Sequence, residues 1–203
     1  DVVGSAGVKA AVICNYDAQD DARLGPMRKL AADIIASSGG YSPVVHLSAH
    51  LGHRPVWRED IQGFVPNPGH ERLLFAGAVA GDFALSQSLE QGALSAQQAL
   101  TRVGNDAPAS PARSCRESIE FALQGLYLVP HPLSTAKAPP QFVDFQLDVS
   151  AAAIEIAIRE GFESVEHVKR YTALGFGTDQ GKLSNVNGVA IAAKALGQSM
   201  KET

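Results

Sequence analysis

Short apolar runs bounded by turn residues characterise the first half of the chain. Residues 8–14 (VKAAVIC) and 33–37 (DIIAS) have the pattern of buried strands, and residues 72–78 (RLLFAGA) have that of a third. The third run leads through glycines into residues 82–100, which are rich in helix formers, with Asp82 placed as the N-cap. Because strand, glycine turn and helix follow one another, this part of the chain is predicted to be an α/β nucleotide-binding layer.

Proline and alanine interrupt this pattern in two stretches, residues 104–112 and 130–140. Such compositions are typical of linkers. The sequence between them, residues 113–128, predicts one short helix. We therefore expect an α/β domain over residues 1–103 and a linker over residues 104–140.

A helical pattern begins at Ser150 and continues almost to the end of the chain. Ser150, Ser164 and Asn185 each start a segment in which apolar residues recur at helical spacing. The expected fold class is therefore α/β followed by α, with a small helical domain over residues 141–203. A domain of about 60 residues has a small core, so we expect it to lean on a neighbour.

The composition is that of an ordinary soluble globular protein, with 45% hydrophobic and 19% charged residues in a chain of 203. A net charge of −4 and a pI near 5.8 give no sign of a nucleic-acid or membrane-surface partner. No apolar run approaches the roughly 20 residues that a membrane helix needs. Cys14 and Cys115 are too few and too scattered for a disulfide framework, so we expect a cytoplasmic location.

The two ends of the chain indicate an internal piece of a longer protein. The first residues, DVVGSAGVKAAVIC, lack a start methionine and run straight into a predicted strand. The last residues, ALGQSMKET, form a charged tail after a predicted helix. We therefore expect an excised or proteolytic piece.

The glycine-rich stretch GAVAGDF, residues 77–83, is the first candidate for a functional site. Backbone N–H groups at a helix N-terminus bind phosphates, and glycine lets a dinucleotide approach the backbone closely. No GxGxxG fingerprint occurs anywhere in the chain. The residues alone leave two interpretations open, a dinucleotide-binding turn and a glycine turn that serves packing.

Three histidines, His46, His50 and His53, lie within the short stretch HLSAHLGH. Histidines at positions i and i+4 of a helix can share a metal ion. Pro43 and Pro55 disfavour a continuous helix, however, and no Glu in zincin spacing and no nearby Cys accompanies the histidines. We therefore favour ordinary loop histidines and predict no metal ligand.

Cys115 and Trp57 are candidates of a different kind. Arg113 and Arg116 flank Cys115 and could lower the pKa of its thiol, but no histidine lies near it in the sequence. We interpret Cys115 as structural or incidental and Trp57 as part of the core. No catalytic residue is therefore predicted in this chain.

Two segments, SGGYSPVVHL and RLLFAGAVAGDFALSQSLEQGALSA, resemble the C-terminal third of the two-dinucleotide-domain flavoprotein reductases. In that superfamily the Asp of an Ala-Gly-Asp turn contacts the flavin, and here Ala78 stands in its place. The chain resembles in this feature the alpha subunit of heterotetrameric sarcosine oxidase, in which the bound dinucleotide is NAD. Residues 1–103 would then be the C-terminal part of an FAD/NAD-type dinucleotide-binding domain, with the fingerprint glycines upstream of residue 1. The resemblance implies that the following residues bind this cofactor: Gly77, Ala78, Gly81, Phe83 and Leu85.

The segment Val143–Gly188 resembles the domain that follows the dinucleotide domain in these alpha subunits. Its Val-Asp-Phe-Gln start, its Glu-His-Val-Lys-Arg-Tyr-Thr helix and its Thr-Asp-Gln-Gly-Lys turn carry the resemblance, which extends over essentially the whole chain. It implies part of an enzyme that oxidatively demethylates sarcosine and forms peroxide, with FAD in the beta subunit and FMN at the alpha–beta interface. The partners would be the beta subunit, the small subunits and the rest of alpha, including a folate domain after Thr203. No complete active site is expected in the chain itself.

The same segment shares a ground plan with [2Fe-2S] domains of the bacterioferritin-associated ferredoxin type. Laid on that plan, the four ligand positions are Asp144, Gln146, Asp179 and Ser184. Thiolates hold such clusters, and none of these residues is a cysteine. The resemblance therefore implies a helical domain that has lost its cluster cysteines and binds no iron–sulfur cluster.

Polar and basic residues surround these positions. We expect the following to contact FMN or the beta subunit: Lys169, Arg170, Thr172, Asp179, Gln180 and Lys182. Lys182 and nearby backbone amides could hold an anion. A solvated basic face is the open alternative for this surface. For the chain as a whole, the alternative is a catalytically silent binding or assembly module of a related amine or opine oxidase.

Overall fold

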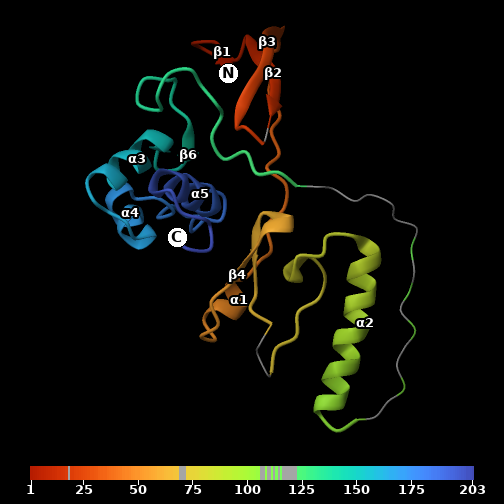
Figure 1. Cartoon of the computed structure of the whole chain (residues 1–203). Helices are drawn as coiled ribbons and strands as arrows, with labels where there is room; N and C mark the ends of the chain where they lie inside the picture. The colour runs from red at the N-terminus through yellow and green to blue at the C-terminus, as the bar shows by residue number, and fades with distance from the viewer. Residues whose placement is uncertain are drawn as a thin grey trace. The chain divides into compact units, whose positions relative to one another are not determined.

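The computed structural model describes residues 1–17, 19–68, 72–105, 108, 111, 113, 115 and 123–203 (Figure 1). These residues form two compact units. One unit joins Asp1–Gly40 to Leu126–Thr203, and the other is Tyr41–Gly125. The predicted division at residues 103 and 140 does not follow this grouping and stays a prediction.

A small antiparallel sheet opens the first unit. Its strands, in spatial order, are β1 (Val2–Val3), β2 (Ala10–Asp17) and β3 (Ala22–Ala31). β2 confirms the strand predicted over residues 8–14. The sequence did not predict β3, because Gly25 and Pro26 are typical of a turn. β3 lies at the edge of the sheet, where proline is tolerated because its nitrogen can face away from the neighbouring strand.

Two strand predictions are wrong. Residues 33–37 form no strand, and Ile34 is 84% exposed. Residues 72–78 are irregular and lead into the 3-10 helix η2 (Gly77–Ala80). A short apolar run remains a strand only if another strand completes its backbone hydrogen bonds, and within the described residues neither run pairs with one.

The second unit contains a short hairpin and one long helix. Its elements are α1 (His46–Ala49), β4 (Val56–Arg58), η1 (Glu59–Ile61), β5 (Gly63–Val65), η2 and α2 (Leu85–Arg102). The prediction that Trp57 is a core residue is confirmed, because its side chain is 4% exposed and its ring lies 5.0 Å from that of Phe64. The hairpin therefore provides the buried centre of this unit.

Helix α2 confirms the helix predicted over residues 82–100, but it begins three residues later than Asp82. Ala84 occupies the N-cap position, and no side chain caps the helix there. Asp82 is therefore not the N-cap, and its carboxylate instead accepts a hydrogen bond from Gln91. Half of the predicted helix over residues 113–128 lies outside the described residues, and its described part from residue 123 onward is not helical.

The rest of the first unit is the helical part of the chain. Its elements are β6 (Phe142–Asp144), β7 (Val149–Ser150), α3 (Ala151–Arg159), α4 (Val165–Thr172) and α5 (Asn185–Leu196). The three predicted helices are thereby confirmed. Ser150 Oγ caps α3 by accepting from the Ala153 N–H over 3.3 Å. Ser164 and Ser184 hold the N-cap positions of α4 and α5 without a side-chain cap bond.

A compact apolar core joins these helices to the β6–β7 pair. Its buried members are Val143, Val149, Ala151, Ile154, Ala157, Val168, Leu174, Ile191 and Ala192. Tyr127 and Leu128, which the sequence assigns to the linker, also pack against this core. In the described part of the chain, no helix combines the length and the apolar character needed to cross a bilayer.

Candidate functional site

The glycine turn at residues 77–82 is the first candidate site. Gly77 and Gly81 have φ angles of 67° and 89°, which glycine adopts without strain. The Gly81 N–H donates to the carbonyl oxygen of Ala78 over 3.1 Å, and the Asp82 N–H donates to that of Gly77 over 3.2 Å. The turn therefore uses these N–H groups within its own backbone.

One face of helix α2 holds this turn. Ser88, Gln91 and Ser95 are spaced at i, i+3 and i+7, which places them on one side of the helix. Gln91 Oε1 accepts from the Gly77 N–H over 2.9 Å, and Gln91 Nε2 donates to the carboxylate of Asp82. Ser88 Oγ donates to the Asp82 carbonyl oxygen over 3.1 Å. Ser95 Oγ donates over 3.3 Å to a carbonyl oxygen just before the turn.

Arg58 reaches the same turn from strand β4. Its Nη1 donates to the carbonyl oxygen of Ala80 over 3.0 Å, and its other nitrogens pair with Asp60. The hydrogen bond with Asp60 raises the pKa of the guanidinium against a smaller opposing effect of burial. A β-carbon at Gly81 would lie 2.8 Å from Arg58 Nη1, so this close approach requires glycine. The glycine therefore has a packing role in the turn.

Phe83 and Leu85 carry the chain from the turn into α2, and both side chains are exposed. The ring of Phe83 lies 6.4 Å from that of Tyr41. The predicted dinucleotide-binding residues therefore form one short stretch from η2 to the start of α2. Their contact with NAD stays a prediction.

A buried carboxylate is the centre of the second candidate site. Asp144, at the end of β6, is 3% exposed. Its Oδ1 accepts from the N–H groups of Gln146 and Leu147 over 2.9 and 3.2 Å. Its Oδ2 accepts from the Gly175 N–H over 2.9 Å and from Ser184 Oγ over 3.4 Å. This one side chain ties the β6–β7 turn to the loop that precedes α5.

The surroundings of Asp144 favour its charged form. Burial alone raises the pKa of this carboxyl. The N–H groups of Gly175, Gln146 and Leu147, together with the Ser184 hydroxyl, outweigh burial, so the pKa lies below its ordinary value. The carboxylate is therefore charged at neutral pH and fully engaged with donors of the chain.

The remaining positions of the predicted ground plan make bonds of the same kind. Gln146 Oε1 accepts from the N–H and the hydroxyl of Thr178 over 2.6 and 2.9 Å. The Asp179 carboxylate accepts from the N–H groups of Gly181 and Leu183 over 3.2 and 3.3 Å. The side chains of Gln146 and Asp179 thus add hydrogen bonds that stabilise the β6–β7 turn and the loop before α5.

The other predicted contact residues lie on α4 and in the loop after it. Arg170, Gln180 and Lys182 are exposed, and Lys169 is half-buried. Thr172 ends α4, where its hydroxyl donates to the Val168 carbonyl oxygen over 2.8 Å. Arg170 and Lys182 therefore present their charges to solvent in this part of the domain.

Large apolar side chains are exposed on the same loops. Phe145 is 78% exposed and Leu183 is 76% exposed, and Phe176 is also largely exposed. Each of them is adjacent in sequence to a residue that Asp144 or its partners hold in place. Hydrogen bonds to the buried Asp144 therefore fix these loops, while their large apolar side chains face solvent.

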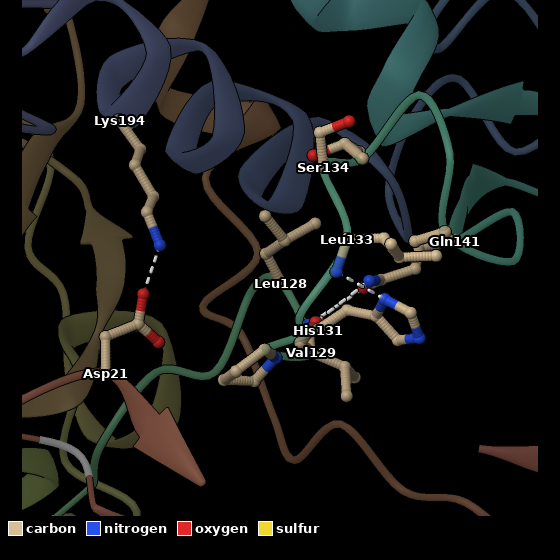
Figure 2. Close-up of a pocket in the computed structure, with 11 residues that line it drawn as sticks. Asp21, Leu128, Val129, His131, Leu133, Ser134, Gln141 and Lys194 are labelled. Atoms are coloured by element: carbon tan, nitrogen blue, oxygen red, sulfur yellow. Dashed lines mark hydrogen bonds and ion pairs between the residues drawn. The ribbon is translucent and has the colours of Figure 1, made fainter.

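A hollow of about 230 Å³ also lies in the first unit (Figure 2). Lys194 of α5 pairs there with Asp21 of the β2–β3 turn, which lowers the pKa of the Asp21 carboxyl. Gln141 accepts from the Val129 N–H over 2.8 Å and donates to the Val129 carbonyl oxygen over 2.9 Å. The hollow is open and contains none of the residues that the sequence singles out.

The histidines and cysteines are the remaining candidates for metal or thiol chemistry. His46 begins α1 and His50 follows its last residue. Among the described residues, no group of His, Cys, Asp or Glu is placed to hold a metal ion. Cys14 and Cys115 are free and half-buried.

Sequence reasoning missed the roles of Gln91 and Arg58. The polar spacing of Ser88, Gln91 and Ser95 on a predicted helix was the available signal for the first. Arg58 is distant from the turn in sequence, so nothing local points to it. Asp144 was identified as a former ligand position, but its role as a hydrogen-bonded crosslink requires the fold.

Comparisons with known proteins come from both sequence and structure. Residues 138–203 match the sarcosine oxidase A3 domain family. The chain is 35% identical over 96% of its length to the sarcosine oxidase subunit alpha of Rhizobium meliloti (strain 1021). It is 33% identical over 88% of its length to that of Corynebacterium sp. (strain P-1). It spans about a fifth of these relatives, 20% and 18% of their lengths.

The structure also resembles the solved structure of a dehydrogenase. The crystal structure of L-proline dehydrogenase from P. horikoshii matches the whole chain with a TM-score of 0.61 and 19% identity, and the chain covers 40% of it. At this identity the likeness concerns the fold alone. The predicted mixture of α and β structure is thereby confirmed.

Proposed function

We propose that this chain is part of a sarcosine oxidase alpha subunit, because residues 138–203 match the sarcosine oxidase A3 domain family and nearly the whole chain is similar to such subunits. The 35% identity over 96% of the chain is the observation that carries this proposal. The full enzyme would oxidatively demethylate sarcosine and form peroxide. This chain would contribute surfaces that hold cofactors and partners.

The turn at residues 77–82 and the start of α2 would form one side of an NAD site. The tight glycine turn and the exposed Phe83 and Leu85 support this role, because together they offer backbone and apolar surface to a planar ligand. The buried Gly77 and Gly81 would shape the backbone of this side of the site, and the exposed Ala78 between them would face the cofactor. When bound, NAD would occupy the dinucleotide domain, of which residues 1–103 would be the C-terminal part.

The helical domain would contact the beta subunit and the FMN shared with it. The exposed basic residues Arg170 and Lys182, with Lys169 beside them, support this role because FMN carries a phosphate. Thr172, Asp179 and Gln180 would complete the surface. FAD would belong to the partner subunit, and a flavin would supply the electron transfer that this chain's residues do not perform.

An iron–sulfur cluster does not fit the residues of this domain. Asp144, Gln146, Asp179 and Ser184 present oxygen atoms where such a cluster needs thiolates. The side-chain oxygens of Asp144, Gln146 and Asp179 already accept hydrogen bonds from N–H and O–H groups of the chain, and the Ser184 hydroxyl donates to Asp144. We interpret the domain as a ferredoxin-type scaffold in which hydrogen bonds replace the cluster.

We further propose a cytoplasmic enzyme whose partners are the beta subunit, the small subunits and the remaining parts of alpha. The two free cysteines, which lie far apart in the sequence, support a reducing compartment. The relatives are named as subunits, which supports an assembly of several chains.

Purification of the native complex through its full alpha subunit tests the proposal. Adding sarcosine without oxygen should bleach the flavin absorption bands, and readmitting oxygen should yield peroxide. Replacing Lys169, Arg170 and Lys182 together by Ala should lower the FMN content and weaken beta-subunit binding. A complex without flavin, or one whose flavin is not reduced by sarcosine, would contradict the proposed activity.

A further inference from the structure

The side chain of Gln91 connects the two ends of the glycine turn. Its Oε1 accepts from the N–H of Gly77, where the turn begins, over 2.9 Å. Its Nε2 donates to the carboxylate of Asp82, where the turn ends. Gln91 lies 14 and 9 residues away from these partners and comes from the second turn of α2. One half-buried amide therefore closes the turn from outside.

Only an amide of this length satisfies both partners. Gly77 presents a donor and Asp82 presents an acceptor, and the glutamine side chain carries one group of each kind. A carboxylate in its place would face the charge of Asp82, and an apolar side chain would leave the Gly77 N–H without its partner. The pairing therefore depends on chemistry as well as on size.

The neighbouring contacts make the position of α2 relevant to the turn. Ser88 Oγ donates to the Asp82 carbonyl oxygen over 3.1 Å, and a β-carbon at Gly77 would lie 3.2 Å from Ser88 Oγ. Residues 78–80 lie between the two ends that Gln91 holds. Gln91 thus fixes the two ends of the turn, while Arg58 and the turn's own backbone hydrogen bonds hold the residues between them.

We propose that Gln91 is the positioning residue of the dinucleotide-binding turn: it does not touch the cofactor but fixes the backbone that does. This inference rests on the proposed function, in which residues 77–85 line an NAD site. Loss of both hydrogen bonds should weaken NAD binding about tenfold, because the turn would no longer be held in its binding conformation.

The test is made in the purified oxidase with the full alpha subunit, by measuring the NAD released on denaturation and the Kd for added NAD. Gln91→Glu should raise the Kd about tenfold, because the new carboxylate repels Asp82. The double variant Gln91→Glu/Asp82→Asn should restore binding, because the amide introduced by Asp82→Asn donates to the carboxylate introduced by Gln91→Glu.

Gln98→Glu is the matched control, because Gln98 is exposed on the same helix and the substitution adds the same charge. It should leave NAD binding unchanged. The FMN content and subunit composition, measured on every variant, identify any that fail to assemble, and the double variant then decides the matter. Among variants that assemble with normal FMN content, the rescue ties the loss of NAD binding to the pairing of residues 91 and 82.

The possible results distinguish a failure of the role of Gln91 from a failure of the proposed NAD-binding function. An unmodified oxidase that releases no NAD would overturn both. If the unmodified oxidase releases NAD but the Gln91→Glu and Gln98→Glu variants bind NAD with the same Kd, the role of Gln91 alone would be overturned. A loss of binding in Gln91→Glu that the double variant does not restore would also overturn it, because the amide pairing would not be the cause.

Discussion

The turn at residues 77–82 and the loops around Asp144 are both irregular and both held by side-chain hydrogen bonds, but their supports differ. The amide of Gln91 is neutral and half-buried, and α2, which carries it, has no buried residue. Asp144 is charged and buried, and Ile154 and Leu174 of the adjoining core are at most 1% exposed. The second region is therefore stabilised by its own core, and the first depends on local polar contacts.

Removing the charge of Asp144 should have the largest effect on this comparison. Asp144→Asn turns an acceptor toward the donors of Gly175 and Ser184 into a donor, and should cost about 2–4 kcal/mol of the free energy of unfolding. Chemical denaturation of the 203-residue chain, with hydrogen exchange in α3 and α5, would measure it. Asp148→Asn is the matched control, because Asp148 is exposed nearby. Equal free energies of unfolding for the two variants would contradict the claim that Asp144 stabilises the helical part of the chain.

Two glycine substitutions should act in opposite directions in the two regions. A β-carbon at Gly188 of α5 would lie 2.3 Å from Cδ2 of the buried Leu174, so Gly188→Ala should cost about 1–3 kcal/mol by overpacking. Gly92 of α2 has nothing within 4 Å, so Gly92→Ala should stabilise the helix by about 0.5–1 kcal/mol. Thermal unfolding of both variants by circular dichroism checks this. Destabilisation by Gly92→Ala would mean that α2 is closely packed.

Acid should loosen the helical part through Asp144. Because folding lowers the pKa of this carboxyl, its contribution is fully present above its unfolded pKa, near 3.8. The contribution is lost as the pH falls through the folded value. The difference in the free energy of unfolding between the unmodified chain and Asp144→Asn should therefore shrink from about pH 5 downward. Denaturant titrations at several pH values measure it, and a constant difference down to pH 3 would contradict the assignment.

The ion pair of Lys194 with Asp21 should matter least. Its side chains are 59% and 43% exposed, so solvent screens their attraction. Lys194→Met should change the free energy of unfolding by less than about 0.5 kcal/mol, and the small change should vanish in high salt. A loss above 1 kcal/mol, measured by denaturation, would show instead that the contact between α5 and the β2–β3 turn is structural.

The sequence predicted best where local rules decide the structure. Ser150 and the apolar spacing after it indicate α3, and α4 and α5 follow in the same way. The runs at residues 33–37 and 72–78 failed because a strand needs a partner that local sequence does not name. Gln91 and Asp144 bind groups 9 to 40 residues away, so their roles appear only when the chain is folded.

Hydrogen exchange of the full alpha subunit, alone and in complex with the beta subunit, tests the central proposal that this chain holds cofactors and partners in place. We predict that beta-subunit binding slows exchange in residues 169–183, where basic and apolar side chains face solvent on fixed loops. Exchange in the core helix α3 should be equally slow in both states. Unchanged exchange over residues 169–183 in an assembled, FMN-containing complex would contradict the account.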